Sequence, residues 1–161
     1  MEHAFRGPHK LLERLGTLDP ATIADADPER FAEVCAQQPA VHRFPGSMAA
    51  RLQELARLVV EDYDGDASRL WTEAADGRDL LRRVQALPGF GKQKAQIFVA
   101  LLAKQRGVRP EGWEKVVGDY ALEGYRSVAD VVDAASLQKV RDHKKEMKAA
   151  AKAAKAAAAD A

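Results

Sequence analysis

The chain has 161 residues, a formal net charge of +1 and 47% hydrophobic residues. This length fits one domain or one domain with a tail, and the hydrophobic fraction is enough to form a core. The single cysteine, Cys35, excludes an intramolecular disulfide and a four-cysteine zinc or iron–sulfur site. Residues 1–10 lack the apolar run of a signal peptide, and no later segment has membrane-spanning length, so we expect a cytoplasmic protein without a membrane partner.

Basic residues are concentrated in two parts of the sequence. Residues 78–109 contain eight basic residues and one acid, and residues 139–161 contain seven basic residues and three acids. Removing these contributions of +7 and +4 from the total of +1 leaves −10 on the rest of the chain. A polyanion such as nucleic acid therefore finds two attractive regions on an otherwise acidic protein.

Start and stop signals predict several helices in the first part of the chain. Asp19-Pro20 and Asp27-Pro28 each place an N-cap acid before a proline that suits the first helical position. Ser47 is the expected cap of a longer helix, which should end at Asp64-Gly65-Asp66. Apolar residues at helical spacing predict the core-facing side of this helix: Met48, Leu52, Leu55, Ala56 and Val59.

Two further helices are predicted in the middle of the chain. The first runs from near Gly77 and ends before Pro88, because a residue that precedes proline disfavours helical geometry. The second begins at Lys92, with Ala95, Phe98, Val99 and Leu102 at helical spacing. No segment shows the alternation of a strand, so the sequence predicts an all-α fold.

The last part of the sequence has weaker signals. Residues 107–124 are predicted to be irregular, with Trp113 and Tyr120 as anchors. Ser127-x-x-Asp130 resembles a capping box, which should open one or two more helices. From residue 148 to the final aspartate the sequence contains only alanine and lysine, which predicts an exposed, frayed basic helix.

The five residues between the two central helices have a composition typical of a phosphate-binding turn. Pro88 fixes one dihedral angle, Gly89 and Gly91 permit positive φ and close approach of another chain, and Phe90 fills the space between the helices. The first N–H groups of the next helix lack intrahelical partners and lie at the positive end of its dipole. A plain helical hairpin with a glycine C-cap is the alternative. The expected DNA contacts are Leu87, Pro88, Gly89, Phe90, Gly91, Lys92, Gln93 and Lys94, with Arg82 and Arg83 as supporting charges.

The pattern Val84-x-x-Leu87-Pro88-Gly89-Phe90-Gly91-x-x-x-Ala95-x-Ile97 resembles the helix-hairpin-helix signature of the endonuclease III and adenine glycosylase superfamily. The likeness covers residues 19–110, and the whole chain is most similar to small actinobacterial base-excision repair proteins of this type. It implies recognition of damaged or mismatched duplex DNA, extrusion of the base and hydrolysis of the glycosidic bond. On this basis we assign residues 1–138 to a glycosylase-like domain with its hairpin at 79–104, and residues 139–161 to a basic tail. A nucleoid-associated location follows.

The resemblance also identifies where catalytic residues should lie. Bifunctional members have a lysine two residues after the second hairpin glycine, where this chain has Gln93. A carboxamide cannot form a Schiff base, so we expect a monofunctional DNA N-glycosylase without lyase activity. The family's catalytic aspartate follows a loop that residues 107–110 resemble, and the candidates here are Glu114 and Asp119. No cofactor is expected, apart from an optional monovalent cation at the carbonyls of Gln85, Leu87 and Phe90.

In the family a long apolar helix precedes the region matched by residues 2–15, and this sequence begins after that position. We expect a monomer, with self-association if the missing helix leaves part of the Met48 face uncovered. Two alternative functions stay open. One is a truncated or non-catalytic DNA-binding module that uses the same hairpin. The other is a protein-interaction hairpin with a nonspecific polycationic tail.

Overall fold

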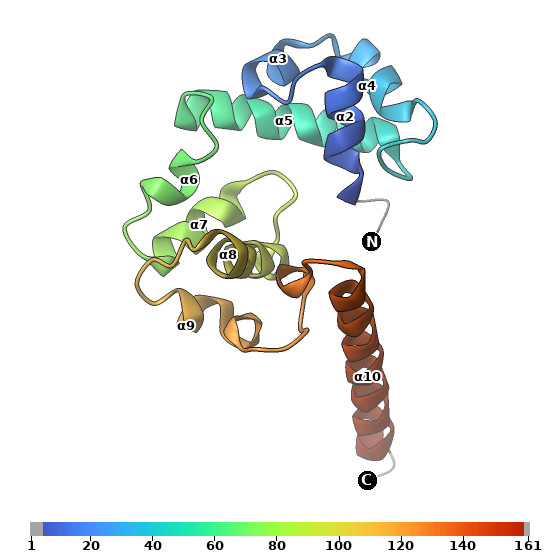
Figure 1. The fold of residues 1–161 in the computed structure, drawn as a ribbon, viewed down its shortest axis with the longest axis vertical. Coiled ribbons are helices and arrows are strands. Elements are labelled where there is room, and N and C mark those ends of the chain that lie inside the picture. Colours follow the sequence, from blue (N-terminus) through green and yellow to red (C-terminus); the bar gives the residue numbers. More distant parts are fainter. Residues whose placement is uncertain (1–4, 160–161) are drawn as a thin grey trace. The chain divides into compact units, whose positions relative to one another are not determined.

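The computed structural model describes residues 5–159, with side chains through residue 154, and consists of helices joined by turns (Figure 1). No strand occurs among these residues, which confirms the all-α prediction. The chain forms two compact units. The first extends through Glu73 and includes Leu87–Gly89, and the second contains Ala74–Ala86 and the chain from Phe90 onward.

The first unit contains α2 (Gly7–Leu15), α3 (Pro20–Asp25), α4 (Pro28–Ala36), α5 (Pro45–Tyr63) and α6 (Arg69–Thr72). Helices α3 and α4 both pack on α5, and α2 packs on α4. The two predicted Asp-Pro helix starts are confirmed. The Asp19 carboxylate accepts the Thr22 N–H at 2.8 Å, and the Asp27 carboxylate accepts the Arg30 N–H at 2.9 Å. The buried core of this unit consists of Leu11, Phe31, Cys35, Val41 and Ala49.

Helix α5 ends where predicted, but its start differs from the prediction. Asp64 adopts a left-handed conformation that terminates the helix. Ser47 is not the N-cap: the helix begins at Pro45, and the Ser47 hydroxyl donates to the Phe44 carbonyl at 3.3 Å. Proline at the first helical position explains the earlier start, because its fixed φ is already helical.

The buried side of α5 is also rotated from the predicted side. Ala56 and Val59 are buried as expected, whereas Met48, Leu52 and Leu55 are only partly buried. Ala49 and Gln53 are buried on the same helix as Ala56 and Val59. The Gln53 side chain is satisfied there because its Nε2 donates to the Ala26 carbonyl at 2.7 Å, near the end of α3. A buried glutamine with a backbone partner is invisible to a search for apolar spacing. Its contribution shifts the buried stripe toward Ala49.

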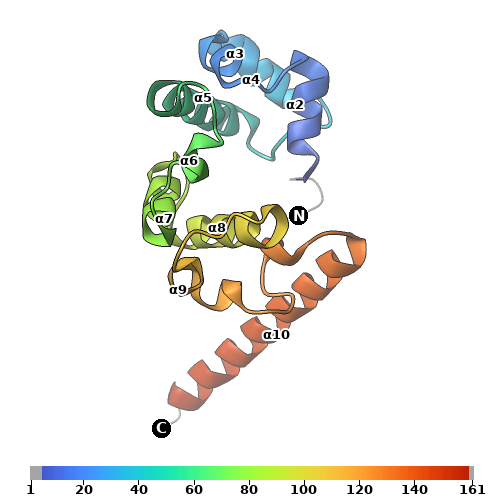
Figure 2. The same ribbon diagram turned by 60° about the vertical axis from the view of Figure 1, so that its left-hand side comes forward.

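The second unit is built around one central helix, α8 (Lys92–Arg106). Helix α7 (Gly77–Ala86), α9 (Trp113–Val117) and the 3-10 turns η1 (Gly118–Ala121) and η2 (Val128–Asp130) all pack against α8 (Figures 1 and 2). The predicted start and end of α7 and the predicted start of α8 are confirmed. Small side chains dominate the contact surface of α8, since Ala95, Val99, Ala100 and Ala103 are completely buried.

The segment after α8 is more ordered than predicted. Residues 113–121 form α9 and η1 instead of an irregular loop, although Trp113 is buried as the expected anchor. A Cβ atom added to Gly77 would lie 2.6 Å from the Trp113 backbone, and the Gly77 N–H donates to the Glu111 carbonyl at 2.8 Å. The start of α7 therefore needs glycine, because the chain before α9 passes directly over it.

The predicted capping box is confirmed, but it opens only a single 3-10 turn. Ser127 and Asp130 make the reciprocal bonds of the box around η2. The final helix, α10 (Ala134–Ala159), begins after it, where the Asp133 carboxylate accepts the Ser136 N–H at 2.6 Å. Helix α10 is continuous through residue 138, where we placed the boundary between domain and tail.

Four polar side chains of α8 donate hydrogen bonds to α9 and to the segment between α9 and α10. Near the end of α8, Lys104 Nζ donates to the Leu122 carbonyl at 2.7 Å and to Asp130 Oδ1 at 2.6 Å. The next residue, Gln105, donates to the Ala129 carbonyl at 2.8 Å. Toward the start of the helix, Gln96 donates to the Val116 carbonyl and Gln93 to the Tyr120 hydroxyl, both at 2.9 Å.

We predict that Lys104→Met destabilises the protein. The Asp130 side chain is only 8% exposed, and the substitution leaves its carboxylate with backbone donors but no cation. We expect a loss of about 2 kcal/mol in the free energy of unfolding, less than for a fully buried pair because Lys104 keeps some solvent contact. Urea denaturation measures this loss. Arg82→Met is the control, because Arg82 is 77% exposed beside Asp79 and should lose less than about 0.5 kcal/mol. Equal losses would contradict a special role for the Lys104 pair.

Candidate nucleic-acid interface

The turn that joins α7 to α8 uses its two glycines differently. Gly89 has a φ of +78°, a left-handed conformation that residues with a Cβ rarely adopt. Gly91 has a φ of −80° and a ψ of 170°, so it does not use the positive φ that glycine permits. Gly91 is instead the N-cap of α8, and no atom outside its chain neighbours lies within 4 Å of an added Cβ. Gly91, Lys92 and Gln93 are all exposed at the start of α8.

The first turn of α8 presents backbone donors. The helix ladder begins when the Ala95 N–H donates to the Gly91 carbonyl at 3.0 Å. The amides of Lys92 and Gln93 precede this bond, and glycine at the N-cap supplies no side-chain acceptor. The Phe90 ring packs edge-on against Phe98 with 5.7 Å between ring centroids, which fixes the chain as it enters the helix.

Several of the basic residues between 78 and 109 already have partners inside the protein. Asp79 accepts hydrogen bonds from both Arg82 and Arg83. The pKa of Asp79 is lowered, chiefly by the Ala75 N–H and then by Arg82, so its carboxylate stays ionised beside these arginines. Arg109 donates to the Ala103 carbonyl at 3.2 Å. The side chains of Lys92 and Lys94 are exposed near the turn. The local charge available to a polyanion is thus smaller than the sequence count implied.

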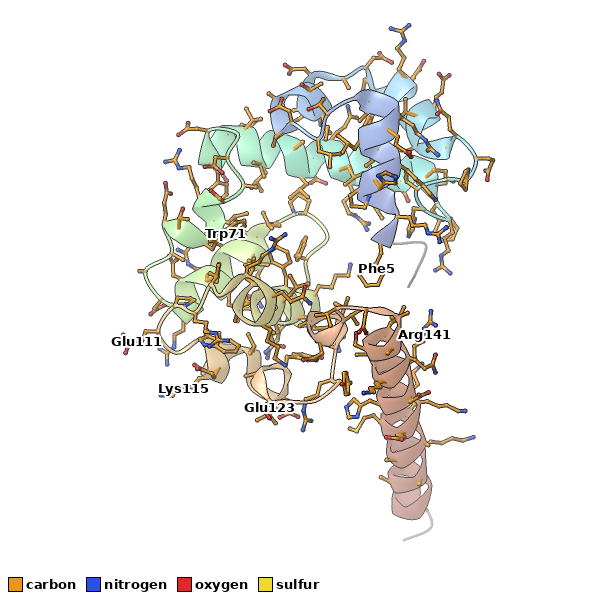
Figure 3. The ribbon with its side chains drawn as sticks, in the orientation of Figure 1. Phe5, Trp71, Glu111, Lys115, Glu123 and Arg141 are labelled. Carbon is orange, nitrogen blue, oxygen red and sulfur yellow. The ribbon has the colours of Figure 1, made fainter. Side chains whose placement is uncertain are left out.

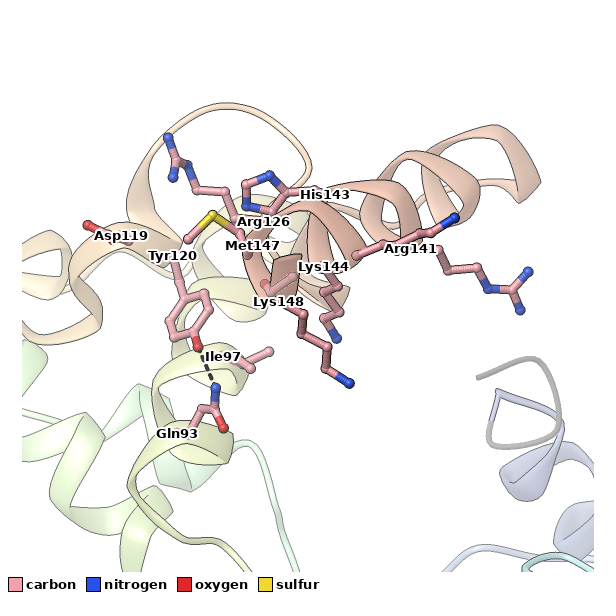
Figure 4. Close-up of a pocket in the computed structure, with 12 residues that line it drawn as sticks. Gln93, Ile97, Asp119, Tyr120, Arg126, Arg141, His143, Lys144, Met147 and Lys148 are labelled. Carbon is pink, nitrogen blue, oxygen red and sulfur yellow. Dashed lines mark hydrogen bonds between the residues drawn. The ribbon is translucent and has the colours of Figure 1, made fainter. Parts of the chain in front are cut away.

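A groove of about 760 Å³ lies in the second unit, next to the first turn of α8 (Figure 4). Gln93 and Ile97 line it from α8, and Asp119 and Tyr120 line it from η1. The side chain of Gln93 points to the Tyr120 hydroxyl across the groove. The remaining lining residues come from the segment before η2 and from α10: Arg126, Ser127, Arg141, His143, Lys144, Lys145, Met147 and Lys148.

The groove distinguishes the two candidate acids. Asp119 is an exposed lining residue, and it shares the groove with Gln93, at the position where the resemblance expects a lysine. Glu114 lies in the first turn of α9, is exposed, and does not line the groove (Figure 3 shows its neighbours Glu111 and Lys115). The structure therefore brings Asp119, and not Glu114, to the predicted site.

Sequence reasoning missed most of the groove. Tyr120 was expected to be only a packing anchor, and the residues of α10 were expected to lie in a separate tail. The available signal was the repetition of lysine at positions 144 and 148, which places both on one side of a helix.

Trp113 packs in the interior, and Trp71 is partly buried. The carbonyls of Gln85, Leu87 and Phe90 remain a prediction as cation ligands.

Within the described part of the chain, no group of three or more histidine, cysteine or acidic side chains is arranged to hold a metal ion. None of the described helices combines the length and apolar character needed to cross a membrane.

We predict that alanine costs more stability at Gly89 than at Gly91. Gly89→Ala forces a Cβ into the left-handed region and should cost about 1–2 kcal/mol in the free energy of unfolding. Gly91→Ala places a Cβ in open space with an ordinary φ, so its cost should stay below that of Gly89→Ala. Thermal or urea denaturation of both variants checks this. A larger loss at Gly91 would contradict the described turn.

Comparison with known proteins does not indicate a function for this chain. The chain matches no protein-family model, and no similar protein is found among curated proteins or among solved structures. The function must therefore be argued from the residues of the chain itself.

Proposed function

We propose that this chain binds duplex DNA through the turn between α7 and α8 and acts in base-excision repair as a monofunctional DNA N-glycosylase. The observation that carries the proposal is the exposed, glycine-capped start of α8 directly after the left-handed Gly89. Two helices joined in this way, with this sequence pattern, resemble a helix-hairpin-helix phosphate clamp.

The physical basis is the attraction between the start of α8 and a phosphate. The amides of Lys92 and Gln93 combine with the positive end of the helix dipole, and an anion is the natural partner of such an arrangement. The exposed lysines 92 and 94 add charge around it. Because the donors are backbone groups, they read the sugar–phosphate chain and not the base sequence, as a repair protein that must search DNA requires.

The proposed chemistry uses the Asp119 carboxylate. Hydrolysis of a glycosidic bond develops positive charge on the sugar, and a carboxylate in the groove stabilises that charge and helps orient water. Gln93 holds the position of the family's nucleophilic lysine. Its carboxamide donates to the Tyr120 hydroxyl and offers no amine for a Schiff base. The reaction therefore ends at base release and leaves the DNA strand intact.

A DNA-binding module without chemistry is the second candidate. It is favoured by the exposure of Asp119, because a catalytic carboxylate gains most of its effect when water is excluded from the site. The hairpin serves the same role in both candidates. Base release is the property that separates them.

We predict that Lys92→Pro weakens DNA binding about tenfold more than Lys92→Ala. Proline removes the Lys92 N–H, and a hydrogen bond to a charged phosphate contributes enough for a change of this size. The substitution fits the structure because proline suits the first position of a helix and Gly91 is already extended, as a residue before proline prefers. Fluorescence anisotropy with a labelled duplex measures both affinities.

The alanine variant is the matched control, since both substitutions remove the lysine charge and only proline removes the backbone donor. Denaturation curves should show the two variants to be similarly stable. If both bind the duplex equally well, the backbone clamp is wrong.

We predict that Asp119→Asn lowers base release by at least about 100-fold while leaving duplex affinity nearly unchanged. Glu114→Gln, which changes an acid outside the groove in the same way, should keep wild-type activity. The assay is base release from a panel of oligonucleotides that carry different damaged or mismatched bases. If the wild-type protein binds the panel without releasing any base, the second candidate is correct.

A further inference from the structure

We infer that the groove beside α8 holds one strand of the bound DNA, with Lys144 and Lys148 of α10 contacting its phosphates. The part of α10 that lines the groove is then a built part of the DNA-binding surface and not the start of a loose polycation. This inference rests on the proposed DNA-binding function, and it adds the path of the strand and the residues that hold it.

The charge of the groove is the first observation. Its lining includes five lysine or arginine side chains, whereas Asp119 is its single acid. Lys144, Lys145 and Lys148 are exposed, so their ammonium groups keep access to an incoming ligand. In a protein whose total charge is only +1, this collection favours a polyanion over a neutral or cationic partner.

The anchoring of α10 is the second observation. Leu137 and Val140 are buried in the second unit, and Lys139 donates to the Tyr125 hydroxyl at 3.1 Å. Lys144 lies about one helical turn beyond Val140, and Lys148 lies one turn further. Their positions are thus set by a packed helix. Figure 4 shows both side chains extending from the same side of α10.

The apolar part of the groove indicates a DNA strand instead of a small inorganic anion. Ile97 is partly buried and Met147 is 58% exposed, and both add hydrocarbon to the lining of the groove. A nucleic-acid strand carries apolar sugar and base surface between its phosphates, and mixed surfaces of this kind suit it. A lone phosphate would use only the cations.

The groove adjoins the hairpin, and this position favours a DNA strand as its ligand. Gln93 belongs to the first turn of α8, where the proposed backbone clamp lies, and it also lines the groove. A DNA strand whose phosphate is bound by the clamp can therefore continue directly into the groove. The lysines of α10 then attract the phosphates that follow the one bound at the hairpin.

The chain provides its own matched control. Lys152 follows Lys148 by four residues on the same side of α10 and is exposed, but it does not line the groove. Lys155 follows at the next turn in the sequence. The double variants Lys144→Ala/Lys148→Ala and Lys152→Ala/Lys155→Ala remove the same charge from the same alanine-rich helix, and alanine preserves helix propensity.

The test compares the salt dependence of duplex binding for the full chain and the two double variants. Two lost phosphate contacts should lower the slope of log affinity against log salt by about 1.8. We expect this fall for Lys144→Ala/Lys148→Ala and less than half of it for Lys152→Ala/Lys155→Ala. Equal falls for the two pairs would overturn the inference and make α10 a nonspecific polycation.

Two further measurements separate the possible failures. Charge reversal, Lys148→Glu against Lys152→Glu, should repeat the asymmetry with larger effects, and equal effects would count against the groove. If Lys92→Pro weakens binding while the lysine pairs behave alike, the clamp stands and the groove proposal fails. If the wild-type chain does not bind duplex DNA at all, the proposed function fails and this inference fails with it.

Discussion

The second unit depends on the way in which α8 satisfies the backbone of the segment beside it. Along its length, Gln93, Gln96, Lys104 and Gln105 each reach a group between residues 116 and 131. Gln96, Lys104 and Gln105 donate to backbone carbonyls there, while small residues such as Ala95 and Ala103 let the neighbouring elements approach closely. The position of η1, and with it the candidate acid, follows from this set of contacts.

The same contacts change the meaning of the charge pattern. Lys104 and Arg109 count as basic residues in the sequence, but in the structure each donates to groups inside the protein. Arg82 and Arg83 share one carboxylate. Lys92 and Lys94 are exposed in the first turn of α8, and further lysines of α10 line the groove. Clustered basic residues in a sequence therefore indicate a region that attracts anions. Which of those side chains can contact a ligand depends on their partners in the folded protein.

The proposed binding and catalytic roles belong to different chemical groups of the site. Binding is proposed for backbone amides, which tolerate most side-chain changes, whereas base release is proposed for one exposed carboxylate. Gln93 connects the two because it lies in the first turn of α8 and reaches across the groove to Tyr120.

The sequence by itself determined the features that neighbouring residues encode. The Asp-Pro helix starts, the end of α5 at Asp64, the helix boundaries around Pro88 and the Ser127 capping box all depend on groups within about four positions. Tertiary structure decided the rest. The rotated face of α5 required the Ala26 carbonyl as a partner for Gln53, 27 positions away. Tyr120 reached Gln93 across the same separation, and α10 joined the groove, because those contacts depend on how helices pack and have no periodic signal in the chain.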